Sequence, residues 1–188
     1  MAKIINNTQV ITNKVRLSYA NIWEPKSVNG SDPKYSCSLL IPKEDGETVN
    51  CIKQAIQAAY EAGKNILAGS GKTAPALKLI KTPLRDGDEE RPDDESYKGM
   101  YFINATSKNA PQIVDRALET ITDHTKVYSG CYVRASITMY AFSVSGNRGI
   151  ACGLNNLQKV SDGESLMGRT SAASDFDALE DEDDDFLA

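Results

Sequence analysis

The chain has 188 residues, 40% of them hydrophobic, and a formal net charge of −5. This length accommodates one domain with a substantial core but not two large ones. No stretch approaches the roughly 18 consecutive apolar residues of a transmembrane helix, and the first residues lack the apolar run of a secretory signal, so we expect a cytoplasmic protein that does not bind membranes.

Two strands are expected near the N-terminus. Residues 13–23 alternate apolar and polar side chains, with Val15, Leu17 and Tyr19 on one face, which is the period of a half-buried strand. Residues 34–41 repeat this alternation and end before Pro42, which interrupts a strand. Turn-forming residues separate the two segments, so we expect them to pair as a β-hairpin.

Residues 47–68 change to helical spacing, with apolar side chains at Val49, Ile52 and Ile56. Asp45 is suited to cap the start of this helix and Gly69 to end it. Residues 81–98 are rich in proline, glycine and carboxylates and have no period, which predicts a loop or a mobile excursion.

The second half of the chain is expected to be mostly β. A third strand is predicted at residues 99–107, followed by a short helix at 111–120 and a long β segment at 126–144. The sequence Ser-Gly-Asn-Arg-Gly at residues 145–149 predicts a turn into a last strand at 150–160.

This inventory predicts a mainly β protein with one or two helices. Five strands are too few for a sandwich, and there is no βαβ alternation for a parallel sheet. A five-stranded Greek-key barrel, the OB-fold, fits the count, and we place it at residues 1–162. Residues 163–188 turn to glycine, serine, alanine and charge, which predicts a linker and a disordered acidic tail.

Sequence motifs for catalysis are weak. Gly69 to Thr73 resembles the end of a phosphate-binding loop, but Ile66 stands where that motif needs glycine. His124 is the single histidine and the four cysteines are widely spaced, which argues against a zinc site, a disulfide framework and an activated nucleophile. We therefore expect a protein without enzymatic activity that binds no cofactor and no metal ion. The carboxylates between Asp86 and Glu95 leave a magnesium-dependent nuclease as an alternative.

Aromatic residues are concentrated on the predicted strands, and several lie next to a cation. Rings on a strand face can stack with bases while neighbouring cations neutralise phosphates, so such a surface can hold single-stranded nucleic acid without reading its sequence. The same rings could instead fill the core. The candidate contacts are Arg16, Tyr19, Trp23, Lys34, Tyr35, Lys98, Tyr101, Tyr132, Arg134 and Tyr140.

The charge is segregated toward the C-terminus. The last fourteen residues hold eight acidic and no basic side chains, which leaves 18 acidic and 21 basic residues upstream. An acidic peptide with an aromatic tip can dock into a basic pocket of a partner, or compete with DNA for the protein's own groove. A purely solubilising tail is the alternative. The candidate partner-binding residues are Asp181, Glu182, Asp183, Asp184, Asp185 and Phe186.

Several short segments, taken in order, resemble a family of phage and prophage single-stranded-DNA-binding proteins with an OB-fold. They include Ser-Tyr-Ala-Asn at 18–21, Leu-Ile-Pro-Lys at 40–43, Leu-Arg-Asp-Gly-Asp at 84–88, Phe-Ile-Asn-Ala at 102–105 and Gly-Leu-Asn-Asn-Leu-Gln-Lys at 153–159. In this family an aromatic residue commonly ends the chain, whereas here Leu187 and Ala188 follow Phe186.

The resemblance implies a protein that coats exposed single strands in replication and recombination. It also implies dimer formation and a tail that contacts replication proteins such as a polymerase or helicase, and it leaves duplex DNA open as a second ligand. A structural or virion module that never binds nucleic acid is the remaining alternative.

Overall fold

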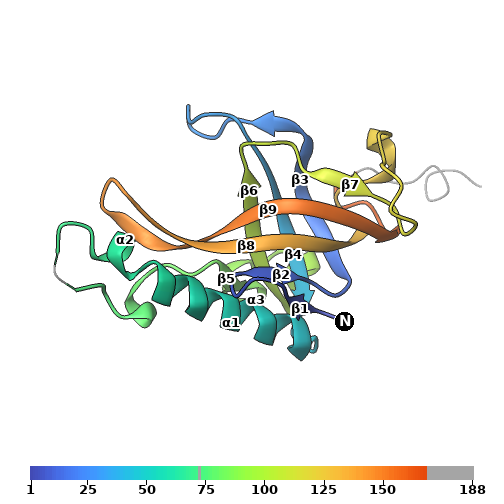
Figure 1. The fold of residues 1–188 in the computed structure, drawn as a ribbon. Helices are drawn as coiled ribbons and strands as arrows, with labels where there is room; N and C mark the ends of the chain where they lie inside the picture. The colour runs from blue at the N-terminus through green and yellow to red at the C-terminus, as the bar shows by residue number, and fades with distance from the viewer. Residues whose placement is uncertain (72, 169–188) are drawn as a thin grey trace, which may run out of the picture.

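The computed structural model describes residues 1–71 and 73–168. Within them the strands form one connected sheet that closes into a barrel (Figure 1). The strands are β1 (Lys3–Ile4), β2 (Gln9–Ile11), β3 (Val15–Lys26), β4 (Lys34–Pro42), β5 (Leu84–Asp86), β6 (Met100–Ser107), β7 (Gln112–Val114), β8 (Tyr132–Val144) and β9 (Asn147–Ser161). The helices are α1 (Gly46–Ala62), α2 (Lys64–Ala68) and α3 (Gly87–Glu90), and single 3-10 turns span Leu77–Leu79, Glu95–Tyr97 and His124–Lys126.

Five strands close the barrel in the order β3–β4–β6–β9–β8, and β8 returns to β3. The pairings β3–β4, β4–β6, β8–β9 and β3–β8 are antiparallel, whereas β6 and β9 run parallel. The parallel pair joins strands that are not consecutive in the chain, so the path has the Greek-key character of the OB-fold. The predicted mainly β OB-fold is confirmed.

The core lies inside the barrel, where alternate residues of each strand point inward. Leu17, Leu39, Ile103 and Ile137 have no exposed surface. Three of the free cysteines, Cys37, Cys131 and Cys152, pack into the same core as small apolar side chains. Burial raises the pKa of the Cys37 thiol to about 12, so this group stays protonated at neutral pH and is a poor nucleophile.

Helix α1 packs against β8 beside β1 and β2 (Figure 1). Asp45 caps it as predicted, since the carboxylate accepts a hydrogen bond from the Thr48 amide. The predicted helix at residues 47–68 is interrupted at Gly63, after which α2 begins. A Cβ at Gly63 would lie 2.2 Å from the Cβ of Ala141, so the helix approaches β8 closely at this point only because position 63 carries no side chain.

The prediction of a short helix at residues 111–120 is wrong. Residues Gln112–Val114 form β7, which pairs in parallel with β9 and extends the sheet beyond the barrel. The chain then turns back, with Leu118 in the left-handed region at φ +69°. Backbone hydrogen bonds to the edge of β9 outweigh the weak helical preference of this segment.

Residues 81–98 are not a plain loop. Strand β5 pairs with β6, α3 follows, and Tyr97 is only 1% exposed. Tyr97 packs with Leu40 and Phe102 in a small second core on the outer face of β4 and β6. Burial of the Tyr97 ring therefore anchors residues 81–98, a segment whose composition predicted a mobile loop.

Among the described residues no helix is long and apolar enough to cross a membrane. The predicted acidic tail at residues 175–188 lies outside the described residues. Lys72, within the segment 69–73 that resembles the end of a phosphate-binding loop, also lies outside them. The division into residues 1–162 and 163–188 stays a prediction.

Candidate nucleic-acid interface

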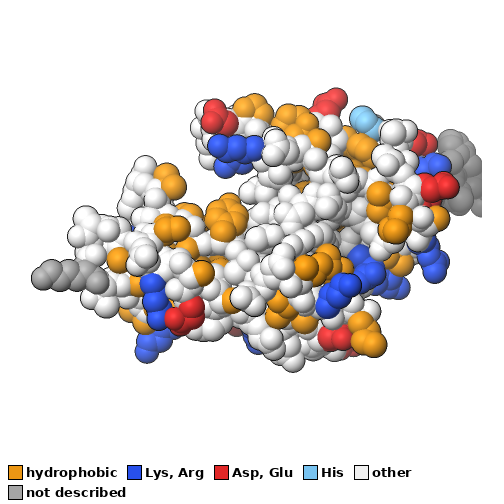
Figure 2. All heavy atoms as spheres, viewed as in Figure 1, with side chains coloured by type: hydrophobic (Ala, Val, Ile, Leu, Met, Phe, Trp, Pro, Cys, Tyr) orange, Lys and Arg blue, Asp and Glu red, His pale blue; other side chains and the backbone are white. Residues whose placement is uncertain are grey.

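The two long hairpins of the barrel diverge and leave a groove between them. β3 and β8 pair at Val15–Val133 and Arg16–Tyr132, and beyond these pairs each strand continues outward into its own hairpin. In Figure 1 the β3–β4 hairpin rises at the top left while the β8–β9 hairpin extends to the left. Figure 2 shows the surface hollowed between them, with few charged side chains on its floor.

The floor of the groove is a row of small uncharged residues, four polar side chains and one glycine, on the outer face of the barrel. The strand register places Asn21 opposite Ser36, Ser36 opposite Thr106, Thr106 opposite Gly153, and Gly153 opposite Thr138. All five are half-buried. This set, the polar row, crosses all five barrel strands and offers hydroxyl and amide groups without a net charge.

An aromatic ring stands beside this floor. Tyr140 is 44% exposed and pairs with Ala151 of β9. A Cβ at Gly153 would lie 3.7 Å from Cε1 of Tyr140, so the ring borders the polar row. Next to it a hollow of about 620 Å³ runs between β5, β6 and the β8–β9 hairpin, and its lining includes Lys81, Arg85, Asn104, Phe142 and Ala151.

Two lysines oppose each other on the β3–β4 hairpin. Lys26 and Lys34 are exposed and directly paired across the strands. Like charges in this position destabilise a hairpin unless an anion lies between them. Tyr35 is half-buried beside Lys34, whereas Lys98 is exposed in the connection to β6, away from this pair in the sequence.

Tyr19 lies on the outer surface, and the prediction that it shares the face of Leu17 is wrong. The register of β3 shifts between Ser18 and Asn21, so the strand carries an extra residue there. Tyr19 takes the left-handed conformation at φ +44° and is 56% exposed. The guanidinium of Arg91 lies 5.7 Å from its ring centroid. The bulge turns the ring outward, as bulges do near functional surfaces.

Three other candidate contacts gather at a different end of the barrel. The guanidinium of Arg16 lies 5.8 Å from the Tyr132 ring and donates a hydrogen bond of 2.9 Å to the backbone oxygen of Glu164. Arg134 donates to the backbone oxygen of Thr12 at 3.2 Å. These cations are already engaged with backbone acceptors: Arg16 contacts the segment that follows β9, whereas Arg134 contacts the N-terminal residues Met1 and Thr12.

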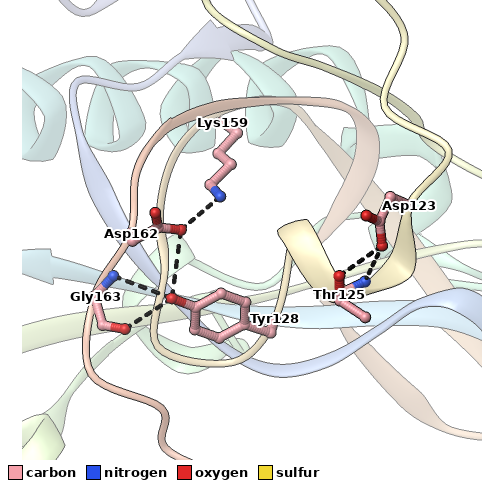
Figure 3. A network of polar contacts seen from close by, with 6 residues as sticks. All are labelled: Asp123, Thr125, Tyr128, Lys159, Asp162 and Gly163. Carbon is pink, nitrogen blue, oxygen red and sulfur yellow. Dashed lines mark hydrogen bonds and ion pairs between the residues drawn. The ribbon is translucent and has the colours of Figure 1, made fainter.

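The segment after β9 is held against the barrel by Tyr128 (Figure 3). The Tyr128 hydroxyl donates to the backbone oxygen of Gly163 at 2.9 Å, and Lys159 forms an ion pair of 2.6 Å with Asp162. Further along, the amide of Leu166 donates to the Ser129 backbone oxygen. Residues 163–166 therefore lie on the barrel surface and fix the point from which the rest of the C-terminal segment starts.

Trp23 and Tyr101 have structural contacts of their own. The Trp23 indole stacks on His124 with centroids 4.4 Å apart, and its N–H donates to the Val127 backbone oxygen at 2.9 Å. Tyr101 packs against the barrel core with Lys43 at 5.2 Å from its ring. Both rings fill space between elements, as the core alternative proposes.

Three of the carboxylates after Pro83, those of Asp86, Asp88 and Glu90, are paired with cations of the chain itself. Lys43 bridges Asp86 at 2.6 Å and Asp88 at 2.8 Å, and Arg85 pairs with Glu90. Hydrogen bonds to these two aspartates raise the pKa of Lys43, and the lysine in turn lowers the pKa of Asp88. In the part of the chain that the structure describes, no group of three potential metal ligands comes together.

The polar row was missed at the sequence level. Its members are small residues that are common in every kind of strand, and only the register of five strands brings them into line. Arg91 was also missed, because a lone arginine in a charged segment has no distinguishing pattern. For Tyr140 the signal was strand alternation, which places it on the same face as Tyr132 and Arg134.

Comparisons with known proteins identify the family of this chain. The family model described as Enterobacter phage Enc34, ssDNA-binding protein, matches residues 8–187. A putative protein p50 of Acyrthosiphon pisum secondary endosymbiont phage 1 is 29% identical over 178 residues, which cover 89% of this chain and 91% of the relative.

Solved structures give the same result. The single-stranded DNA-binding protein from bacteriophage Enc34 in complex with ssDNA is 27% identical, with a TM-score of 0.69 over 88% of this chain and 96% of that one. The gp2.5 single-stranded DNA binding protein encoded by bacteriophage T7 has a TM-score of 0.59 over 87% and 97% of the two chains. At 15% identity this second likeness shows the fold alone. Because the family model spans nearly the whole chain, this protein belongs to the family of phage single-stranded-DNA-binding proteins represented by that of phage Enc34.

Proposed function

We propose that this protein binds single-stranded DNA in the groove between its two hairpins, without sequence preference and without breaking a bond. The observation that carries the proposal is the uncharged polar row, which crosses all five barrel strands. The exposed ring of Tyr140 lies beside this row, and the paired Lys26 and Lys34 lie on the β3–β4 hairpin at one side of the groove. The relative from phage Enc34 was solved with ssDNA bound on the same fold.

Each part of the groove has a distinct role in this proposal. A base stacks on Tyr140, a contact worth about 1 to 3 kcal/mol that every base can make. Lys26 and Lys34 bind phosphate, which relieves their mutual repulsion and releases counterions. The polar row lies close to the bases without offering the bidentate pairs that read a particular one, so binding is strong and indifferent to sequence.

The predicted contacts divide accordingly. Tyr140 and Lys34 border the groove, and Tyr19 lies beyond its Asn21 end. Arg16 and Tyr132 belong in this proposal to the surface where the C-terminal segment begins, so they affect DNA through that segment. Arg134 is bound to the N-terminal residues Met1 and Thr12 and is proposed to make no direct DNA contact. The remaining predicted contacts, Trp23, Tyr35, Lys98 and Tyr101, are proposed to support the surface from outside the groove.

The protein would act in phage replication and recombination in the host cytoplasm. The acidic residues from Asp181 to Asp185, with Phe186, would contact replication proteins such as a polymerase or helicase and compete with DNA for the groove. Dimer formation belongs to the same proposal. Support for a non-enzymatic role comes from the carboxylates Asp86 and Asp88, which are engaged by Lys43.

The test is a binding isotherm with a labelled oligothymidylate, read by fluorescence anisotropy at several salt concentrations. A label on the DNA is preferable to Trp23 fluorescence, because that indole is stacked on His124. The logarithm of the association constant should fall linearly with the logarithm of salt concentration. Tyr140→Ala should weaken binding by about 5- to 150-fold, whereas Leu118→Ala, another exposed apolar side chain far from the groove, should not.

Absence of any salt-sensitive complex with the wild-type protein would overturn the proposal. Incubation of labelled DNA with magnesium tests the nuclease alternative, and intact DNA is the expected product. Removal of residues 175–188 should tighten DNA binding and abolish binding to replication proteins. A structural or virion module would show neither effect.

A further inference from the structure

The exposed ring of Tyr19 has an unfavourable backbone. A positive φ is rare for a bulky aromatic residue, and such strain persists where the surrounding structure or a function requires it. Tyr19 has φ +44° and remains 56% exposed, so the ring gains little packing in return. Glycine or asparagine would adopt this conformation at lower cost. This points to a use for the ring itself.

Arg91 completes a platform at this point. Its guanidinium lies 5.7 Å from the ring centroids of both Tyr19 and Tyr97. Tyr97 is buried and makes an edge-to-face contact with Phe102 at 5.1 Å, so one side of the platform is anchored in the small second core. A planar guanidinium next to an exposed ring adds a flat cationic group of the kind on which bases stack.

The platform continues the groove. The Asn21 side chain, at one end of the polar row, donates hydrogen bonds to the Tyr19 backbone oxygen at 3.2 Å and to Ser36 Oγ at 3.3 Å. Beside Tyr19 the surface is hollowed by about 140 Å³, in a depression lined by Ser18, Tyr19, Asp94, Ser96, Ser129 and Leu166. A strand that follows the polar row past Asn21 therefore arrives at Tyr19.

The surrounding charge selects a base over a phosphate. Arg91 shares a depression of the surface with Glu90, Asp93, Asp94 and Glu95. These carboxylates repel a phosphate, whereas a neutral base can still stack on the guanidinium and the ring. We propose that Tyr19 and Arg91 form a base-binding subsite at the end of the DNA path, where the acidic segment turns the phosphate backbone away. This subsite rests on the proposed function.

Salt dependence distinguishes a stacked base from a bound phosphate. Tyr19→Asn removes the ring and suits the left-handed backbone, so it should raise the thermal midpoint while weakening oligothymidylate binding by about 5- to 150-fold. Tyr19→Phe should bind like wild type.

The guanidinium of Arg91 is tested separately. Arg91→Ala and Arg91→Lys should both weaken binding, because neither alanine nor lysine provides a planar group on which a base can stack. None of these variants should change the slope of affinity against salt, because the protein still neutralises the same phosphates.

A matched control and a length series complete the test. Arg116→Ala removes an exposed arginine from the turn after β7, which lies off the path, and should leave affinity unchanged. Oligothymidylates too short to reach from Tyr140 to Tyr19 should be insensitive to Tyr19→Asn. Wild-type affinity in Tyr19→Asn, or a reduced salt slope in Arg91→Ala, would overturn the subsite. Absence of all salt-sensitive binding in the wild-type protein would instead overturn the proposed function.

Discussion

Filling the floor of the groove at Gly153 provides a direct test of the DNA path. A Cβ at this position would lie 3.6 Å from the Thr138 backbone oxygen and 3.7 Å from Cε1 of Tyr140, both ordinary van der Waals separations. Gly153→Ala is therefore accommodated without strain. It reduces the freedom of the unfolded chain, so we expect the free energy of unfolding to rise by about 0.4 to 1 kcal/mol.

A larger side chain at the same position should separate folding from binding. Gly153→Leu projects from the polar row beside Tyr140 and occupies the space over which a base would stack. Removal of one stacked base weakens binding by about 1 to 3 kcal/mol, or about 5- to 150-fold in Kd. The outward position leaves the barrel core intact, so the thermal midpoint should change little compared with Gly153→Ala.

The assay combines thermal unfolding by circular dichroism with anisotropy of a labelled oligothymidylate. The expected pattern is a folded Gly153→Leu protein with weakened binding and an unchanged salt slope, since the lysines still bind phosphate. A folded Gly153→Leu protein that binds like wild type would show that DNA does not cross the polar row, and the assignment of the groove would be abandoned.

Three further outcomes are expected. Replacing Lys26 and Lys34 by alanine should lower the slope of log affinity against log salt by about 0.7 for each phosphate that the protein no longer neutralises, measured by the same anisotropy titration. Gly63→Val should destabilise the fold by about 1 to 3 kcal/mol through overpacking against β8, measured by urea unfolding. Because Lys43 lowers the pKa of Asp88, their ion pair stabilises the fold above the unfolded carboxylate pKa, and this stabilisation disappears as pH falls through the lower folded value. Lys43→Met should therefore flatten the acid limb of the unfolding curve, and an unchanged limb would contradict this.

The sequence predicted elements whose stabilising interactions are local. The alternation in residues 34–41 and the turn at 145–149 correctly located β4 and the β8–β9 hairpin, and Asp45 correctly marked the start of α1. Period and cap chemistry depend on neighbouring residues alone. Segments stabilised by distant partners were misread: β7 forms on the edge of β9, and residues 81–98 are ordered by the burial of Tyr97.

For the candidate site, too, the sequence predicted what depends on local order, and the tertiary structure decided what depends on distant partners. The strand inventory predicted the OB-fold and charge segregation predicted a basic body with an acidic tail, while the resemblance of short motifs in order indicated the phage single-stranded-DNA-binding family. All of these signals can be read directly from the order of residues in the chain. Which rings face solvent was decided by the tertiary structure. A one-residue bulge turned Tyr19 outward, Trp23 was covered by His124, and the strand register alone aligned Asn21 with Thr138 across the barrel. A single-residue change of register reverses the face of every following side chain, and that register is fixed by pairing between strands far apart in the sequence.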